Sequence, residues 1–242
     1  MKDFRITSIA ASLMLLAVGA LSSFTASHAL PDRETRSVGA FTEVSLGGSS
    51  RVVVKQGSPQ SVAVEGSKDD LADFETEVQG GQLRLKFRNQ EGREFNNKKH
   101  GPVTVYVTAP TLKALRVGGS GKLEVSGPLQ ADGMTLSLSG SGDLLVPQLQ
   151  ASKLETAVSG SGSIMVGGTA TSNDIRISGS GQVKAHDLKT ETSRARISGS
   201  GDAHVYASRT AEGSTSGSGS MYVAGGAQLS SNTHGSGRVV KE

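Results

Sequence analysis

The chain contains no cysteine and no tryptophan, and its aromatic residues are limited to six phenylalanines and three tyrosines among 242 residues. Without cysteine it can form neither a disulfide framework nor a lipid-modified cysteine at a processing site, so packing and backbone hydrogen bonds must hold the fold. Surfaces that bind nucleic acid usually combine a basic stripe with interleaved aromatic side chains. Here the aromatic residues are few and the basic residues are scattered, which argues against a nucleic-acid partner.

Residues 1–29 have the pattern of a secretory signal peptide. Lys2 and Arg5 precede an apolar run from Ile9 to Leu21, and the Ser-His-Ala sequence that ends at Ala29 provides small side chains at a cleavage site. The run is shorter than the ~20 residues that span a bilayer, which argues against a membrane anchor. We therefore expect cleavage after Ala29, export to the periplasm or the cell surface, and no transmembrane segment in the mature chain.

The triplet Gly-Ser-Gly recurs in the second half of the chain at steps of 18 to 21 residues. Its copies begin at Gly119, Gly140, Gly160, Gly179, Gly199, Gly217 and Gly235. A unit of about 20 residues cannot bury its own apolar side and must stack on copies of itself. The spacing therefore predicts a β-solenoid.

Apolar residues keep a fixed position relative to each triplet, which a flexible Gly/Ser linker would have no reason to do. Two residues before the first glycine stand Val117, Leu138, Val158, Ile177, Ile197, Thr215 and Thr233. Four residues after it stand Leu123, Leu144, Ile164, Val183, Ala203, Met221 and Val239. The sixth position after it is also mostly valine or alanine, so a period of two predicts a half-buried strand after each triplet.

Each turn is expected to contain three short strands separated by glycine corners. One strand precedes the triplet, one follows it, and a looser third segment is marked by Leu129, Leu149, Ala170 and Leu188. Three strands per turn, each stacked on its counterpart, predict an all-β, parallel β-helix, and parallel crossovers strongly favour the right hand.

The chain is expected to divide into residues 1–29 as signal peptide, 30–110 as an N-terminal β region, and 111–242 as the repeat solenoid continuous with it. The middle region is strand-like but irregular, as terminal solenoid units must be to shield the open end of the core. Within it, the segment from Gly47 to Val54 is a degenerate first copy of the repeat, and Lys68 to Phe74 is expected to form a helical turn. The polar segment from Asn89 to Gly101 is expected to be the most mobile element.

Several sequence features resemble the bacterial family described as putative auto-transporter adhesins with a head GIN domain. The resemblance rests on the opening Arg36–Phe41, the strand Val52–Gly57 and the strand Val103–Pro110, which lead into the Ser-Gly-Ser-Gly corners, and it covers residues 36–240. It implies a β-solenoid and an adhesin-like role without a defined ligand. The family supplies no catalytic, cofactor-binding or metal-binding residues, so none are assigned.

The sequence lacks the patterns of catalytic and metal sites. Gly121-Lys122 is followed by Leu123 and not by the Ser or Thr of a phosphate-binding loop. Only Asp143 and Asp202 follow the triplets, too few for a column of calcium ligands. The histidines share no ligand spacing and are expected to be isolated surface residues: His100, His186, His204 and His234.

Three classes of function remain open. A polysaccharide lyase or hydrolase would need converging carboxylates, which the acidic residues of the repeats do not form because they occupy different positions in each copy. We therefore expect a non-catalytic protein without cofactors. It is either an interaction or adhesin-like module of the cell envelope, with an envelope protein as partner, or a carbohydrate-binding protein with a glycan ligand.

Two outward-facing columns bear on these alternatives. Serines stack before each triplet (Ser139, Ser159, Ser178, Ser198 and Ser216), where their hydroxyls can hydrogen-bond along the column, bond to the corner backbone, or meet an ordered glycan. At the fifth position after the first glycine stand Glu124, Leu145, Met165, Lys184, His204, Tyr222 and Val240. Four of these seven are apolar or aromatic, which suggests a self-association surface and hence a homo-oligomer, although scattered apolar residues on a surface need no explanation.

Overall fold

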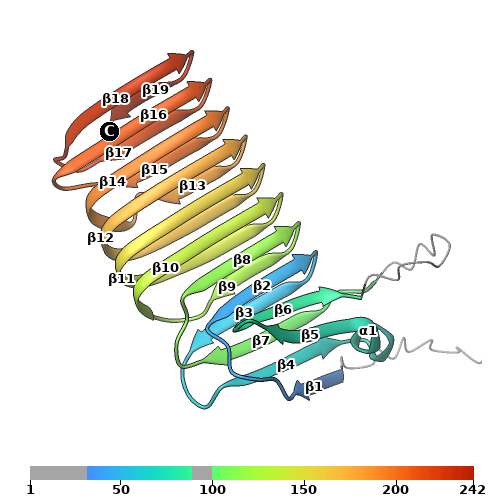
Figure 1. Ribbon diagram of the computed structural model, residues 1–242. Coiled ribbons are helices and arrows are strands. Elements are labelled where there is room, and N and C mark those ends of the chain that lie inside the picture. Colours follow the sequence, from blue (N-terminus) through green and yellow to red (C-terminus); the bar gives the residue numbers. More distant parts are fainter. Residues whose placement is uncertain (1–31, 89–99) are drawn as a thin grey trace, which may run out of the picture. The chain divides into compact units, whose positions relative to one another are not determined.

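The computed structural model describes residues 32–88 and 100–242, which form nineteen strands and one short helix. Strands β2, β3 and β8 to β19 wind into a β-solenoid of about 6 turns with ~20 residues per turn (Figure 1). The all-β solenoid predicted from the triplet spacing is confirmed. The expected signal peptide and nearly all of the expected mobile segment lie outside the described residues.

Each turn has a strand that leads into a glycine corner and a strand that leaves it (Figure 1). Those that lead into a corner are β2 (Glu43–Gly48), β8 (Ala114–Gly119), β10 (Leu129–Gly140), β14 (Leu188–Gly199), β16 (Thr210–Gly217) and β18 (Gln228–Gly235). Those that leave one are β3 (Arg51–Gln56), β9 (Lys122–Val125), β13 (Gln182–Ala185), β15 (Asp202–Tyr206), β17 (Ser220–Ala224) and β19 (Arg238–Lys241). The long strands β11 (Asp143–Gly160) and β12 (Ser163–Gly179) each run from one corner to the next.

The parallel register places equivalent residues of successive repeats directly over one another. Ser139 pairs with Ser159, which pairs with Ser178, and Gly140 likewise pairs with Gly160 and Gly160 with Gly179. Gly48 pairs with Gly119, which confirms that the segment around it is the first, degenerate copy of the repeat.

The third segment of the turn differs from the expectation in two ways. In β10 it is continuous with the strand that leads into the corner, so there are not three separate strands in each turn. Its column also passes through Gly168, which pairs with Leu149 and Leu188, whereas Ala170 pairs with Ala151. The cause is a register shift between Val146 and Leu149, where β12 is one residue shorter than β11.

The corner glycines are required by the backbone and by the stacking. The first glycine of each triplet has a positive φ, for example +117° at Gly160, a conformation that side chains rarely allow. The second glycine is equally constrained by the next turn: a Cβ on Gly181 would collide with Val158 Cγ1 and would lie 2.8 Å from Gly162 O. The sequence predicted the first reason and not the second.

An antiparallel cap ends the parallel stack on the N-terminal side. It consists of β1 (Asp32–Arg36), β4 (Ser61–Gly66), α1 (Lys68–Asp73), β5 (Phe74–Gln79), β6 (Gln82–Phe87) and β7 (Thr104–Ala109). Strands β6 and β7 still run parallel to β2 and β3, but β4 and β5 pair with them in the opposite direction. The predicted helical turn is confirmed as α1, which begins at the N-cap Ser67.

The buried side chains form a single hydrophobic cluster, and the core narrows toward the last turns because its side chains become smaller there. Large aliphatic residues such as Leu136 and Ile175 give way at equivalent positions to Ala195 and Gly213. The space at Gly213 is occupied by its neighbours, since a Cβ there would lie 2.7 Å from Val239 Cγ2. Among residues 32–88 and 100–242, no helix is long and apolar enough to cross a membrane.

Candidate ligand-binding face

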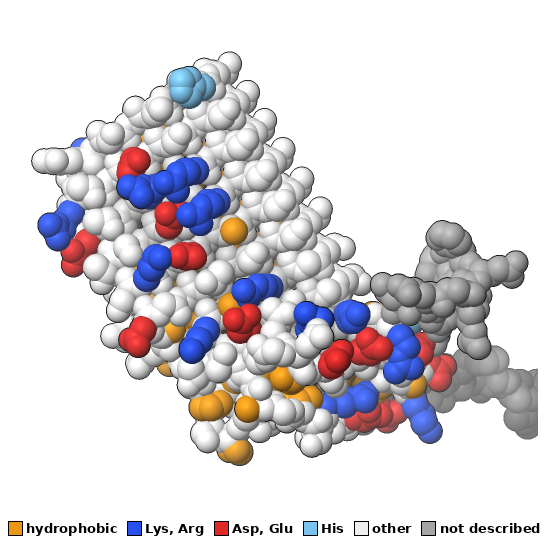
Figure 2. Space-filling model, in the orientation of Figure 1, with side chains coloured by type: hydrophobic (Ala, Val, Ile, Leu, Met, Phe, Trp, Pro, Cys, Tyr) orange, Lys and Arg blue, Asp and Glu red, His pale blue; other side chains and the backbone are white. Residues whose placement is uncertain are grey.

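The strands that lead into the corners form one flat face of the solenoid. Because side chains alternate along a strand, every second residue of β10, β11, β12, β14 and β16 points outward from this face. Next to the corners the outward residues are small and uncharged, and farther from the corners they are charged (Figure 2). The face therefore divides into a neutral strip and a charged band.

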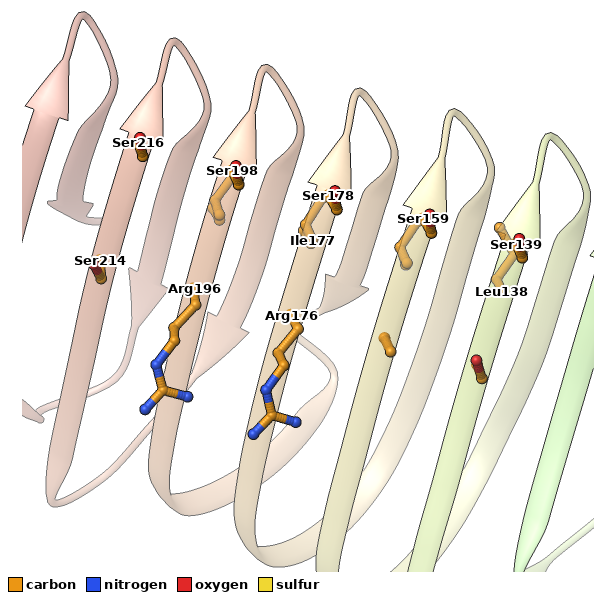
Figure 3. A pocket seen from close by; sticks show the side chains of 14 residues that line it. Leu138, Ser139, Ser159, Arg176, Ile177, Ser178, Arg196, Ser198, Ser214 and Ser216 are labelled. Carbon is orange, nitrogen blue, oxygen red and sulfur yellow. The ribbon is translucent and has the colours of Figure 1, made fainter.

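A groove of about 480 Å³ crosses five strands where the neutral strip meets the charged band (Figure 3). One side of it is the predicted serine column, Ser139, Ser159, Ser178, Ser198 and Ser216. The next outward position along each strand supplies Ser137, Ala157, Arg176, Arg196 and Ser214. We call this feature the serine groove.

Of the three roles open to the serine hydroxyls, hydrogen bonds along the column and to the corner backbone are not formed. Within the described part of the chain, the hydroxyls of the five column serines have no protein partner. The corner backbone is already satisfied, because the amides of Ser141 and Gly142 both donate to the carbonyl of Gly119 one turn earlier. The hydroxyls are consequently free to bind solvent or a ligand.

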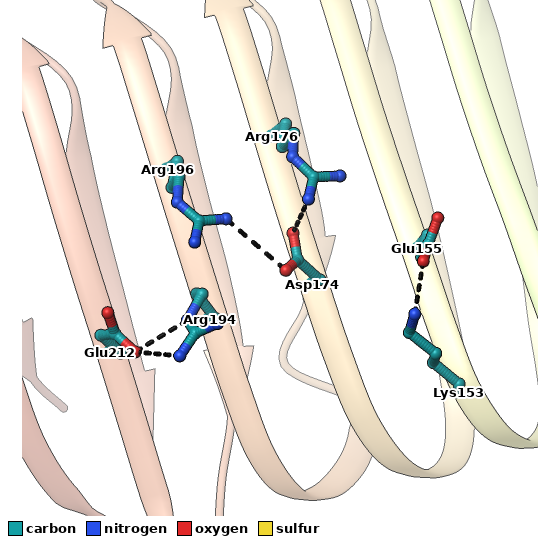
Figure 4. A network of polar contacts seen from close by, with 7 residues as sticks. All are labelled: Lys153, Glu155, Asp174, Arg176, Arg194, Arg196 and Glu212. Carbon is teal, nitrogen blue, oxygen red and sulfur yellow. Dashed lines mark hydrogen bonds and ion pairs between the residues drawn. The ribbon is translucent and has the colours of Figure 1, made fainter.

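Arg176 and Arg196 line the groove and share one carboxylate (Figure 4). A guanidinium nitrogen of Arg176 lies 3.2 Å from Asp174 Oδ1, and one of Arg196 lies 3.6 Å from Asp174 Oδ2. The two arginines lie side by side because the register of β12 and β14 pairs Arg176 with Arg196. A single carboxylate between two half-exposed guanidinium groups leaves positive charge unneutralised at the edge of the groove.

The remaining members of the charged band are more fully paired (Figure 4). Arg194 is held by Glu212, with Arg194 Nη2 2.6 Å from Glu212 Oε2. Lys153 Nζ lies 2.6 Å from Glu155 Oε1, and this hydrogen bond and the lysine charge lower the pKa of Glu155. The charged band, defined as Lys153, Glu155, Asp174, Arg176, Arg194, Arg196 and Glu212, carries four positive and three negative charges.

The chemistry of this face is that of recognition. Hydroxyl groups can donate and accept hydrogen bonds, and guanidinium groups bind carboxylate, sulfate or phosphate. None of the residues that line the serine groove is a carboxylic acid, histidine or lysine that could serve as a general base. Among the described residues, no group of three or more His, Asp or Glu side chains gathers in a way that could hold a metal ion.

The histidines were expected to be isolated surface residues, and for His100 this is wrong. Its ring stacks on Phe87 at 3.9 Å between centroids, and its Nδ1 lies 3.3 Å from Asp70 Oδ1. His204 also has a partner, since its ring stacks on Tyr222 at 4.5 Å.

No binding residues were assigned from the sequence, and Arg176, Arg196 and Asp174 were missed. Arg176 and Arg196 stand three residues before the first glycine of their triplets, as Arg116 also does, and Asp174 stands five residues before it. The available signal was the pairing of two arginines at the same position in adjacent repeats.

Solved structures resemble the chain in fold. A protein from Bacteroides fragilis described as a putative adhesin matches with a TM-score of 0.79 and 21% identity, over 88% of this chain and 97% of that one. Two proteins from Parabacteroides distasonis, described as a putative lipid binding protein and a putative adhesin, match with TM-scores of 0.73 and 0.69. Their identities are 23% and 21%, over 89% and 88% of this chain and 98% and 97% of theirs. At these identities the likeness shows the fold alone.

No curated protein matches the sequence. The family described as "putative auto-transporter adhesin, head GIN domain" matches over residues 40–227, which is most of the chain and includes six of the seven triplets. The proteins that the chain resembles are named as adhesins or lipid-binding proteins and not as enzymes. With this match and the β-solenoid described above, the chain belongs to the head GIN domain family of auto-transporter adhesin-like proteins.

Proposed function

We propose that the protein is an exported, non-catalytic binding module of the cell envelope, and that the serine groove binds an acidic glycan. The family description as adhesin and the signal-peptide pattern of residues 1–29 support export and a surface role. Periplasm or cell surface is the proposed location.

The observation that carries the ligand assignment is the pairing of free hydroxyls with under-neutralised guanidinium groups along one groove. The five serines repeat at the ~4.8 Å spacing of stacked strands, which suits an extended polymer with regularly placed hydroxyl groups. Among the described residues, Asp174 is the one carboxylate within ion-pair distance of Arg176 and Arg196, so an acidic group on the polymer would supply further negative charge. An uncharged glycan would leave that charge unmatched.

Binding of polysaccharides to the purified protein tests this proposal. We expect an acidic polymer such as polygalacturonate to bind, with affinity that falls as salt is added, and neutral dextran of similar size to bind much more weakly. Replacing both arginines, Arg176→Gln with Arg196→Gln, should lower the affinity about tenfold, or ~1.4 kcal/mol.

Arg209→Gln is the matched control, because Arg209 is also exposed and pairs with Glu191 away from the groove. Equal affinity for acidic and neutral polymers, or an equal loss in the control and the double variant, would contradict the proposal. Binding to anionic lipid vesicles without binding to any glycan would also contradict it and would favour a lipid ligand, as the description of one Parabacteroides relative names.

A further inference from the structure

The strands that leave the corners form the opposite face of the solenoid from the serine groove (Figure 1). At the middle outward position of these strands, one column of side chains runs along the solenoid. From β3 to β19 it reads Val53, Glu124, Leu145, Met165, Lys184, His204, Tyr222 and Val240. We call this column the outer strip, and its most exposed large apolar side chain is Met165, at 44%.

The order of residues in the outer strip is self-complementary. Leu145 and Met165 lie side by side at its centre, with Glu124 beyond Leu145 and Lys184 beyond Met165. From this arrangement we infer that the outer strip binds a second copy of the chain, with the two solenoids antiparallel. The twofold axis runs along the strand direction, in the interface, between the strands of Leu145 and Met165.

This symmetry pairs opposite charges and apolar groups. Leu145 of each copy meets Met165 of the other, and Glu124 of each copy meets Lys184 of the other. A twofold interface must be self-complementary in this way, since the same patch serves both subunits. A parallel arrangement in register would instead place Glu124 against Glu124, and like charges would repel.

A second outward column, two residues nearer the corner, also pairs opposite charges across this twofold axis. It reads Arg51, Lys122, Asp143, Ser163, Gln182 and Asp202 from β3 to β15. The same twofold axis passes between Asp143 and Ser163, so Arg51 of one copy meets Asp202 of the other. Two columns therefore give opposite-charge pairs from one axis, which scattered surface residues would not be expected to do.

The size of the strip sets the expected affinity. Because the axis lies between the third and fourth of the eight strands, six strands of the strip face their counterparts in the other copy. Six strands at ~4.8 Å spacing and about four residues of ~3.3 Å each give a surface of roughly 29 by 13 Å, or about 380 Å² per copy. This lies below the ~800 Å² per partner of a standard interface, so the dimer should be weak and visible only at high protein concentration. The inference concerns this strip alone and does not depend on what the serine groove binds.

Charge exchange tests the inference directly. Sedimentation of the purified protein up to several hundred micromolar should show a reversible monomer–dimer equilibrium. Glu124→Lys and Lys184→Glu should each be monomeric alone over the same range, because each variant places like charges against each other. An equimolar mixture of the two variants should dimerise. In that mixed dimer the introduced lysine meets the introduced glutamate, and the unchanged Glu124 of one copy meets the unchanged Lys184 of the other.

The mixture also controls for effects within one chain, where Glu124 accepts a hydrogen bond from Arg51 at 3.1 Å. If either charge variant does not fold, Met165→Glu tests the interface instead, and we expect this variant to be monomeric. Met165 is exposed, so its side chain can change without disturbing the core. A wild-type protein that stays monomeric throughout the range would overturn the inference. So would a dimer that persists in Met165→Glu or in both single charge variants.

Discussion

Gly160 lies against the carbonyl oxygen of Gly140, the equivalent corner residue one turn earlier, so closely that a Cβ on Gly160 would be 2.5 Å from that oxygen. The same contact recurs from corner to corner: Gly179 meets Gly160, and Gly199 meets Gly179. The corners therefore form a column in which backbone rests on backbone, and any side chain would separate two turns.

Gly160→Val should destabilise the protein by at least about 1–3 kcal/mol, because the branched side chain must adopt a φ of +117° as well as enter this contact. Chemical unfolding measures the change. Gly133→Ala in β10 is the control, since Gly133 has no atom within 4 Å of its Cβ position and should change stability little. Equal stability of the two variants would show that the corner tolerates ordinary residues.

Removing a buried hydroxyl should stabilise the core. Thr156 is 1% exposed, stacks between Leu136 and Ile175, and its hydroxyl has no hydrogen-bond partner among the described residues. Thr156→Val keeps the shape and removes the cost of the unpaired group, so we expect a gain of about 1 kcal/mol and a higher Tm. Thr156→Ala should instead lose stability through the cavity that it leaves. A Tm that falls in the valine variant would indicate that the hydroxyl has a partner.

Asp70 joins the cap helix to the segment before β7. Its carboxylate accepts hydrogen bonds from the Ser67 hydroxyl at 2.5 Å and from the Gly101 amide at 3.1 Å, and it contacts His100. The hydrogen bond from Ser67 contributes most to lowering the pKa of Asp70 below its ordinary value of 3.8. A carboxylate with a lowered pKa stabilises the fold above its unfolded pKa, and this stabilisation is lost as the pH falls through the folded pKa.

Asp70→Asn should therefore cost about 1–3 kcal/mol at neutral pH, and the difference from wild type should shrink below about pH 4. Urea unfolding between pH 7 and pH 2 gives both values. Asp69→Asn, at the exposed neighbouring position of α1, is the control and should follow the wild-type pH profile. If the free energy of unfolding differed between wild type and Asp70→Asn by the same amount at every pH, the role given to the carboxylate would be contradicted.

The repeats made the solenoid predictable, because each copy carries the same apolar positions and glycine corner. The sequence analysis placed Ala170 in the column of Leu149, whereas the residue that pairs with Leu149 is Gly168. The error arose because β12 has one residue fewer than β11 at this point, and only Gly168 itself marks the missing residue in the sequence. The cap was predicted only as irregular, since its antiparallel pairs, such as Val62 with Val107, join segments that share no repeat. The site residues were missed because Arg176 and Arg196 become neighbours of one carboxylate only when the turns are stacked.

The last turns should exchange amide hydrogens fastest. The inward columns end in polar or small residues, the buried Gly213 and Thr215 of β16 and the exposed Ser231 and Thr233 of β18, so little apolar area stabilises β18 and β19. Hydrogen exchange should show protection rising from β18 toward β11 and β12. The substitution Thr233→Val should slow exchange in β18. Uniform protection along the solenoid would contradict this gradient.

The narrowing of the core also determines how the molecule would respond to a pulling force. Each turn contacts only its neighbours, so a load applied near the last turn would detach that turn without breaking the others at the same time. Each detached turn of ~20 residues would lengthen the chain by roughly 70 Å. A solenoid built in this way yields by successive extension, and each step dissipates work while the turns nearer the cap remain folded.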